Sequence, residues 1–226
     1  MKNIRTTDTK GDSHIRFITD HDYHIHSGLS LCSANPDQTP EAILRYSKKN
    51  GFKKICLTNP YWDETVPKIC SIKYYDVQNT AYIEKALPLP QDDEVEFRFG
   101  AEVDMDKNFT IGIRGKMLKK LDFIVISTMH FNRVGFTIDE KDNSYERRAD
   151  IFVKRFDKVL AADLPFRKMG LAHITSTLLA PNGFRNHMNV LDMVDDKTFK
   201  ELFTRTAKCG MGVELNLDPS DYSDED

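Results

Sequence analysis

The sequence predicts an α/β fold in which strands and helices alternate around a parallel sheet. Six short apolar runs rich in β-branched and aromatic residues recur along the chain, and stretches with helical spacing lie between them. Of the 226 residues, 40% are hydrophobic, which is enough for a full core. A chain of this length most simply forms one domain, residues 1–226, and it shows no internal repeat and no low-complexity linker.

The six expected strands are short and mostly apolar, as strands covered by helices on both faces should be. They span residues 17–26, 53–58, 95–103, 122–128, 169–174 and 211–217. The spacing predicts four helices, at 40–50, 76–87, 144–160 and 197–209. The first opens with an N-cap threonine and a proline in Thr39-Pro40-Glu41, and the last stops at Cys209-Gly210, where glycine can adopt the left-handed conformation.

The charge balance argues against a nucleic-acid partner. There are 32 Lys and Arg against 35 Asp and Glu, a net charge of −3, and the two signs are mixed along the chain. No run approaches the roughly 18 apolar residues of a membrane span, and the N-terminal segment has no apolar signal-peptide core. The sequence therefore predicts a cytoplasmic protein without a membrane partner.

The cysteines and the C-terminal acids are less informative. Cys32, Cys56, Cys70 and Cys209 form no CxxC pair, so we expect buried thiols, not disulfides or a zinc knuckle. Residues 218–226 contain five acids directly after a strand. They fit either a solvated tail or the first turn of a further helix, in which case the chain stops inside a βα unit.

Histidines and a glutamate recur at the carboxyl ends of the expected strands, where α/β proteins build their sites. His24 and His26 are two residues apart, so both imidazoles can leave the strand on one face and reach one cation. Glu102 ends an apolar strand, where a carboxylate is costly to bury without a cation. His130 and His173 each follow another strand. Together these five residues predict a metal site.

The other candidates are weaker. Asp104 shares the strand parity of Glu102, but we expect a structural role for it. Asn216 could orient a ligand or equally be an ordinary strand-end residue. His14, His21 and His187 lie in polar or loop contexts and are not expected to bind metal.

In order and spacing these motifs resemble the PHP domain, a family named for polymerases and histidinol phosphatases. The family's first motif resembles Asp22-Tyr-His24-Ile-His26-Ser27, and a later one resembles Gly100-Ala-Glu102-Val-Asp104. The single-histidine motifs resemble Met129-His130 and Ala172-His173, and Val213-Glu-Leu-Asn216 is similar to a further segment. The resemblance implies a distorted TIM-like (β/α)7 barrel whose last unit is missing from this chain.

The resemblance also implies a reaction. Two or three divalent ions at the carboxyl face would hydrolyse phosphate esters, with a metal-bridging hydroxide as the nucleophile and Glu102 between the metals. Imidazole and carboxylate ligands suit Zn²⁺, Mn²⁺ or Fe²⁺. Arg133 and Arg185 are candidates to hold the phosphoryl oxygens of a small phosphomonoester such as histidinol phosphate.

Two departures from the family pattern leave other functions open. Asn59-Pro60 stands where the family has Asp-His, so Asp63 or Glu64 could supply an oxygen instead, and the final Asp-x-His motif is absent. The alternative is a degenerate metal-binding module that acts through a partner without catalysis. A third hypothesis, hydrolysis of a non-phosphate bond, would leave the two arginines without a role.

Overall fold

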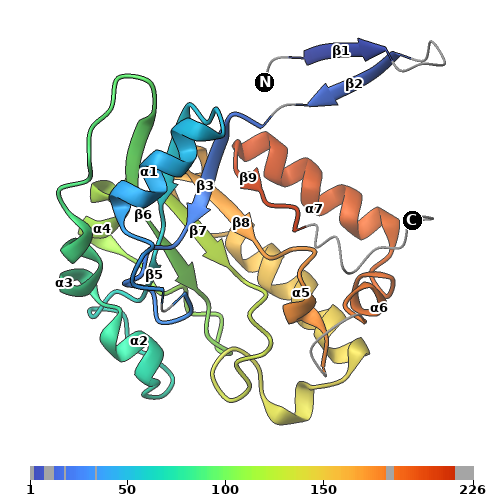
Figure 1. Ribbon diagram of the computed structural model, residues 1–226. Helices are drawn as coiled ribbons and strands as arrows, with labels where there is room; N and C mark the ends of the chain where they lie inside the picture. Colours follow the sequence, from blue (N-terminus) through green and yellow to red (C-terminus); the bar gives the residue numbers. More distant parts are fainter. Residues whose placement is uncertain (1–2, 8–12, 18, 34, 182–185, 217–226) are drawn as a thin grey trace.

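The computed structural model describes residues 3–7, 13–17, 19–33, 35–181 and 186–216, and it has a mixed α/β architecture (Figure 1). Its main sheet has the order β3-β4-β6-β7-β8-β9, with β5 paired to β6, and every pairing is parallel. The strands are β3 (His21–Ile25), β4 (Lys54–Leu57), β5 (Pro60–Tyr61), β6 (Glu96–Asp104), β7 (Phe123–Ser127), β8 (Met169–Ala172) and β9 (Gly212–Val213).

The sheet curls strongly. Tyr23 of β3 stacks on Phe123 of β7 with ring centroids 4.8 Å apart, although β4 and β6 lie between these two strands in the sheet order. Such a contact requires the strands to wrap around a concave side. The result is an all-parallel half-barrel, compatible with part of a TIM-like barrel, in which β3 and β9 are the edge strands of the described sheet.

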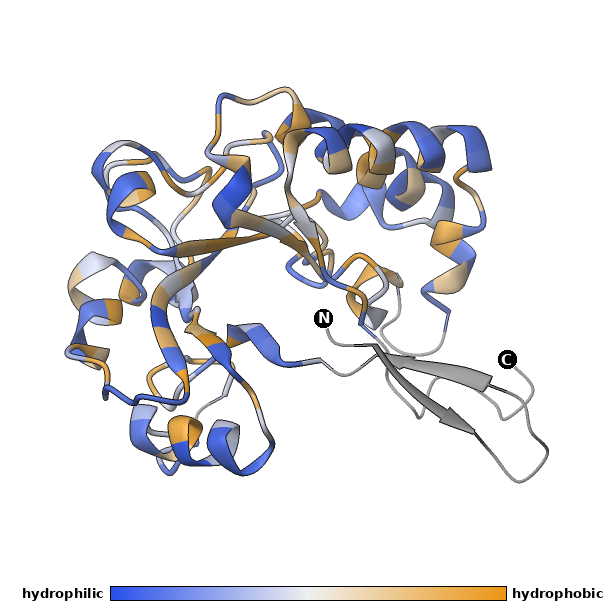
Figure 2. Cartoon of the chain, turned by 90° about the horizontal axis from the view of Figure 1, so that it is seen from above, coloured by the Kyte–Doolittle hydropathy of each residue, from blue (hydrophilic) through white to orange (hydrophobic). Residues whose placement is uncertain are grey.

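Helices follow most strands and cover the convex side of the sheet (Figure 1). In Figure 2 the long helices show hydrophobic and hydrophilic residues alternating along their lengths, as amphipathic surface helices do. The α-helices are α1 (Pro40–Lys49), α2 (Lys73–Val77), α3 (Thr80–Ile83), α4 (Gly115–Lys120), α5 (Tyr145–Leu160), α6 (Met188–Leu191) and α7 (Asp196–Cys209). None of the helices in the described ranges has the length and hydrophobicity needed to cross a bilayer.

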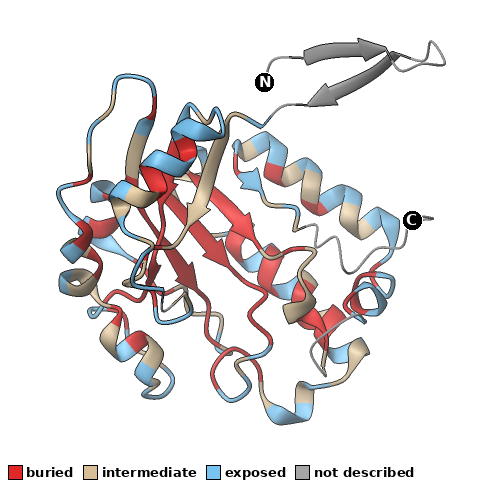
Figure 3. Cartoon of the chain, viewed as in Figure 1, coloured by how far each residue is buried: buried red, intermediate tan, exposed pale blue. Residues whose placement is uncertain are grey.

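The core lies between the sheet and these helices, and the central strands are almost wholly buried (Figure 3). Helices α5 and α7 meet through aromatic edges: Phe152 contacts Phe199, and Phe156 contacts Phe203, at centroid distances of 5.9 and 5.7 Å. This packing holds α5 beneath the loops that leave the carboxyl ends of the strands.

Two fully buried arginines on α5 fix those loops. Arg155 donates to the carbonyls of Met105, Asp106 and Thr137, just after β6 and β7. Arg148 donates to the carbonyls of Phe131, Leu179 and Ala180, which follow β7 and β8. A buried guanidinium is costly unless its donors are used. Here the terminal N–H groups of the two arginines donate to backbone carbonyls and so anchor the three loops that follow β6, β7 and β8.

Three predicted helices are confirmed with small shifts at their ends. Thr39 accepts from the Ala42 N–H at 3.2 Å ahead of α1, and Ser144 caps α5 through the Arg147 N–H. Helix α7 ends at Gly210, which has a φ of 76°. The strand cores are also confirmed, although β9 is shorter than predicted and residue 217 lies outside the described residues.

Two predicted elements were wrong in extent. The strand predicted at 17–26 is divided, because Phe17 ends an antiparallel hairpin of β1 (Asn3–Thr7) and β2 (Ser13–Phe17) and β3 begins only at His21. The helix predicted at 76–87 is broken at Gln78, whose ψ of 61° is not helical. Its carbonyl accepts from Trp62 N–H, and the Asn79 side chain starts α3 afresh.

The expectation of buried thiols was correct only for Cys56. Cys32 and Cys70 are exposed and Cys209 is half-buried. Cys32 and Cys70 lie in loops outside the core strands, where apolar burial does not decide the position of a side chain. The C-terminal acids at 218–226 lie outside the described residues.

Candidate metal centre

Four imidazoles from three strand ends converge on the carboxylate of Glu102. Each approaches through its Nε2 atom: His24 lies 3.5 Å and His173 2.9 Å from Oε1, and His26 lies 3.2 Å from Oε2. His130 lies 3.6 Å from Oε1. The five residues that the sequence predicts as metal ligands are therefore brought together by the fold.

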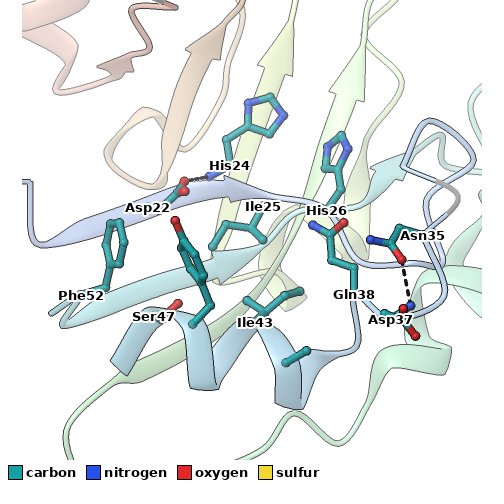
Figure 4. Close-up of a pocket in the computed structure, with 12 residues that line it drawn as sticks. Asp22, His24, Ile25, His26, Asn35, Asp37, Gln38, Ile43, Ser47 and Phe52 are labelled. Atoms are coloured by element: carbon teal, nitrogen blue, oxygen red, sulfur yellow. Dashed lines mark hydrogen bonds between the residues drawn. The ribbon is translucent and has the colours of Figure 1, made fainter. Parts of the chain in front are cut away.

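The first strand supplies two of these imidazoles. Figure 4 shows His24 and His26 pointing the same way, away from α1, as the i, i+2 spacing predicts. The pairing of β3 with β4 shifts register between Asp22 and Ile25, and the Asp22 side chain accepts from the His24 N–H at 2.9 Å. This local irregularity allows both Tyr23 and His24 to reach residues across the concave side.

Glu102 is only 3% exposed on β6, and burial alone would favour its neutral form. The surrounding imidazoles outweigh that effect, led by the charge of His130 and the hydrogen bond from His173, so the pKa of Glu102 lies well below its ordinary value. The lowered pKa favours the ionised form of this buried carboxylate among its nitrogen neighbours.

The outer ring nitrogens of three imidazoles have side-chain partners from other segments. His24 Nδ1 lies 3.0 Å from Glu214 Oε1, His26 Nδ1 lies 3.0 Å from Cys32 Sγ, and His130 Nδ1 lies 2.8 Å from Asp104 Oδ2. Tyr75, fully buried, also donates to Asp104. Metal-binding histidines commonly donate their second ring N–H to such a partner, which fixes the orientation of the ring. Asp104 therefore has the supporting role that the sequence predicts.

These partners shift the histidine pKa values in different directions. Burial disfavours the charged form of His24, but hydrogen bonds to Glu102 and Glu214 outweigh it and raise the pKa to about 10. His26 is likewise raised to about 9, by Cys32 and Glu102 against its burial. Burial prevails at His173, whose pKa is lowered. The raised pKa values favour the protonated rings of His24 and His26 beside the carboxylates of Glu102 and Glu214 when no cation is bound.

The donor set fits a divalent metal. One donor atom each from His24, Glu102 and His173 lies within 4.8 Å of the others, and the buried His26 Nε2 lies 3.2 Å from Glu102 Oε2 without the alignment of a good hydrogen bond. Nitrogen donors grouped around one carboxylate suit Zn²⁺, Mn²⁺ or Fe²⁺ better than Mg²⁺, which prefers oxygen. A cation would replace the protons on these rings and could take His26 Nε2 as a ligand.

Arg133 lies beside this cluster. Its guanidinium stacks over the Tyr74 ring at 3.7 Å from the centroid, and its Nε lies 3.9 Å from Asp104 Oδ2. Burial lowers its pKa, but Tyr75, Asp104 and Tyr74 outweigh that effect and raise it, so the side chain stays charged. Arg185, the second predicted arginine, lies outside the described residues.

The segment that departs from the family pattern has other contacts. Asn59 accepts from the Ser27 N–H at 2.8 Å, and Pro60 pairs beside Glu102 in the sheet. The Asp63 carboxylate accepts from Thr65, and Glu64 accepts from Thr80. These carboxylates therefore accept hydrogen bonds from nearby threonines, and the described contacts bring neither of them to the Glu102 cluster.

Among the remaining sequence candidates, those whose side chains the structure describes make no contact with the cluster. His21 pairs with its neighbour Asp20 at 3.1 Å. His187 is buried, with no partner for its ring among the described residues, and the side chain of His14 on β2 is not described. Asn216 joins its backbone to Thr175, while its Oδ1 is buried without a partner in the described part of the chain.

A cavity of about 490 Å³ borders the cluster at His24 and His26. Its other walls come from α1 and the neighbouring loops and include Tyr46. Figure 4 shows Gln38 and Phe52 among these walls. Because both imidazoles point away from α1, the cavity adjoins the centre without containing the point where the donors converge. It offers room for a small organic group beside the imidazoles of His24 and His26.

Sequence reasoning missed the residues that contact the histidines, Asp104 and Arg133 from outside the cluster. No spacing in the sequence marks Glu214, Cys32, Tyr74 or Tyr75 as site residues. The segment around Glu214 is distinguished only by its resemblance to a segment of the PHP family. Glu214 lies 190 residues from His24 along the chain and Tyr75 lies 29 residues from Asp104, whereas Cys32 is only six residues from His26 and turns back to it from the next loop.

The chain matches no family model and no curated protein sequence. The fold and site alone therefore define its class: an α/β protein with a curled, all-parallel sheet and a His/Glu cluster that could hold a metal.

Proposed function

We propose that this protein is a metal-dependent phosphoesterase that hydrolyses a small phosphomonoester, with a PHP-type arrangement of its barrel. The observation that carries the proposal is the approach of four Nε2 atoms to the single buried carboxylate of Glu102. The resemblance of the motifs to the PHP domain supports phosphate esters as the substrate class. A histidinol-phosphate-like compound is the candidate substrate.

His24, His26, Glu102, His130 and His173 would hold two or three divalent ions. When bound, such ions lower the pKa of water toward neutrality and polarise a phosphoryl oxygen. The chain's own contribution is to fix the donors: Glu102 keeps its charge, and Asp104 and Glu214 fix the rings of His130 and His24. Rigid donors lose little free energy to reorganisation during the reaction.

Arg133 would bind the phosphate group. Its charge is secured, and stacking on Tyr74 fixes the plane of the guanidinium, so that its terminal N–H groups can donate to two phosphoryl oxygens together. Charge spreads over these oxygens in the transition state, where a fixed cation is most effective. A hydrolase of a non-phosphate bond would not need this arginine.

Metal content and turnover test the proposal together. Purified protein should contain about two or three equivalents of zinc, manganese or iron per chain by mass spectrometry and should release phosphate from phosphomonoesters. His24→Ala should lower both. His21→Ala is the matched control, because it removes a histidine of the same strand whose ring pairs with Asp20 and not with Glu102 among the described contacts.

A second candidate is a metal-binding module without catalysis. It is favoured by Pro60, which offers no donor atom at the position beside Glu102 where the family has a histidine. This candidate predicts metal that falls in His24→Ala but no phosphate release from any phosphomonoester at any pH. Protein that binds no metal would contradict both candidates.

A further inference from the structure

We propose that Glu214 is a positioning residue of this centre, holding His24 and His173 in place from the opposite edge of the sheet. The inference rests on the proposed metal site and adds a residue to it. Glu214 directly follows β9, and its carboxylate contacts both residues: Oε1 lies 3.0 Å from His24 Nδ1, and Oε2 accepts from the His173 N–H at 3.0 Å.

The position of Glu214 in the fold gives these contacts their importance. β3 and β9 are the edge strands of the described sheet, so no strand pairing joins them directly. Glu214 crosses between them and connects the end of β9 to His24 on β3. The centre draws ligands from β3, β6, β7 and β8, and this carboxylate restrains the first of these against the last.

The contact with His173 acts on the backbone. His173 has a φ of 63°, a left-handed conformation that is uncommon and costly for a residue with a side chain. Its N–H donates to Glu214 Oε2 in that conformation, which turns the imidazole so that Nε2 lies 2.9 Å from Glu102. Glu214 therefore stabilises the backbone turn that aims this ring.

The contact with His24 acts on the ring. With Nδ1 donating to Glu214, Nε2 is the atom left to face Glu102 and a metal. A carboxylate partner also makes the coordinating nitrogen a stronger donor. Glutamine has the same shape but only one acceptor oxygen, so it would satisfy one of these two N–H groups and present its own NH₂ to the other.

Zn²⁺ affinity in Glu214→Gln tests the role. Competition with a chelator should show affinity about 10- to 100-fold weaker than in the wild type. Glu201→Gln, the same change at an exposed position on α7, should leave it unaltered. Unchanged Zn²⁺ affinity in Glu214→Gln would overturn the role of Glu214. The proposed function would still stand in that case, provided that the wild-type protein binds metal and hydrolyses a phosphomonoester.

A double-mutant cycle separates positioning from a general structural effect. In the His24→Ala background, the change at Glu214 should weaken Zn²⁺ binding much less than it does alone, because one of its two targets is gone. An equal effect in both backgrounds would show that Glu214 does not act through His24.

A measurement on the wild type keeps the inference testable if Glu214→Gln fails to fold. Long-range ¹H–¹⁵N spectra of the Zn²⁺-loaded protein, with His24 assigned by its loss in His24→Ala, should show a proton on Nδ1 and none on Nε2. The opposite tautomer would overturn the role of Glu214. Wild-type protein that binds Zn²⁺ but hydrolyses no phosphomonoester would contradict the phosphoesterase and leave this role intact.

Discussion

Among single residues, Arg133 most directly links the geometry to a phosphate substrate. Arg133→Lys keeps the charge but loses the planar group that stacks on Tyr74 at 3.7 Å. We expect kcat/KM for a phosphomonoester to fall by about 10-fold or more in the lysine variant, and by about 100-fold or more in Arg133→Gln.

Metal content is the control for this prediction, because Arg133 touches no imidazole of the cluster among the contacts described and should leave the bound metal unchanged. Steady-state kinetics on metal-loaded variants would check it. Full activity in Arg133→Gln would remove the argument for a phosphate substrate, while loss of metal would show that the residue supports the site and not the substrate.

The residues that the sequence could predict are those whose own strand determines where they point. His24 and His26 share a face by strand periodicity, and Glu102, His130 and His173 follow from the rule that strand ends form sites. Glu214 could not be predicted, because its role depends on a segment 190 residues away, and Cys32 could not, because the irregular loop after His26 has no periodicity that shows where its thiol points. Hydrogen-bond partners of this kind leave no pattern in the local sequence.

Among the elements, helix α7 offers a clean test of a local signal. Gly210 has a φ of 76°, and its N–H and that of Met211 donate to carbonyls of the last turn. Gly210→Ala should therefore lower the free energy of unfolding by about 1 kcal/mol, because a Cβ is disfavoured at positive φ. Thermal or urea unfolding would measure it.

Gly212→Ala provides the matched control for that substitution. Gly212 is not at positive φ, and its added Cβ would meet only ordinary contacts, the nearest at 3.5 Å from the Met169 carbonyl oxygen. A similar loss of stability in both variants would argue against left-handed strain at Gly210 as the cause.

Helix ends with a cap were predictable, whereas breaks imposed by tertiary contacts were not. The spacing at 76–87 is helical, yet Gln78 is fully buried and its side chain accepts from Leu31 N–H while its carbonyl accepts from Trp62 N–H. Those distant partners outweigh one turn of local hydrogen bonding. The division of 17–26 has a similar basis, since Phe17 pairs with Asn3.

At the scale of the whole molecule, the half-barrel is held around its charged centre by long-range polar contacts. Arg148 and Arg155 anchor the loops after β6, β7 and β8 from below, and Glu214 joins the two edge strands at the carboxyl side. Stability and metal binding should therefore be coupled, because the groups that fix the ligands also connect distant parts of the sheet.

This coupling predicts how pH acts on the metal-free protein. The pKa values of His24 and His26 are raised from the ordinary 6.5 to about 10 and about 9. Between the ordinary and the raised pKa of each ring, the folded state therefore binds more protons than the unfolded state. Their contribution to stability is complete below pH 6.5 and is lost as the pH rises toward 10. The lowered pKa values of Glu102 and Glu214 act at the acid side, where stability is lost as these groups are protonated.

In the presence of a chelator, the melting temperature should therefore decrease as the pH rises from 6.5 to 9. The decrease should be smaller in His24→Gln, because this variant lacks one of the titrating rings. Added Zn²⁺ should raise the melting temperature more at pH 8.5 than at pH 6.5, since the metal competes with protons for the same nitrogens and stabilises the folded state in proportion to its binding. A metal-free protein whose stability is constant across this range would contradict the protonated state of His24 and His26 in the folded protein.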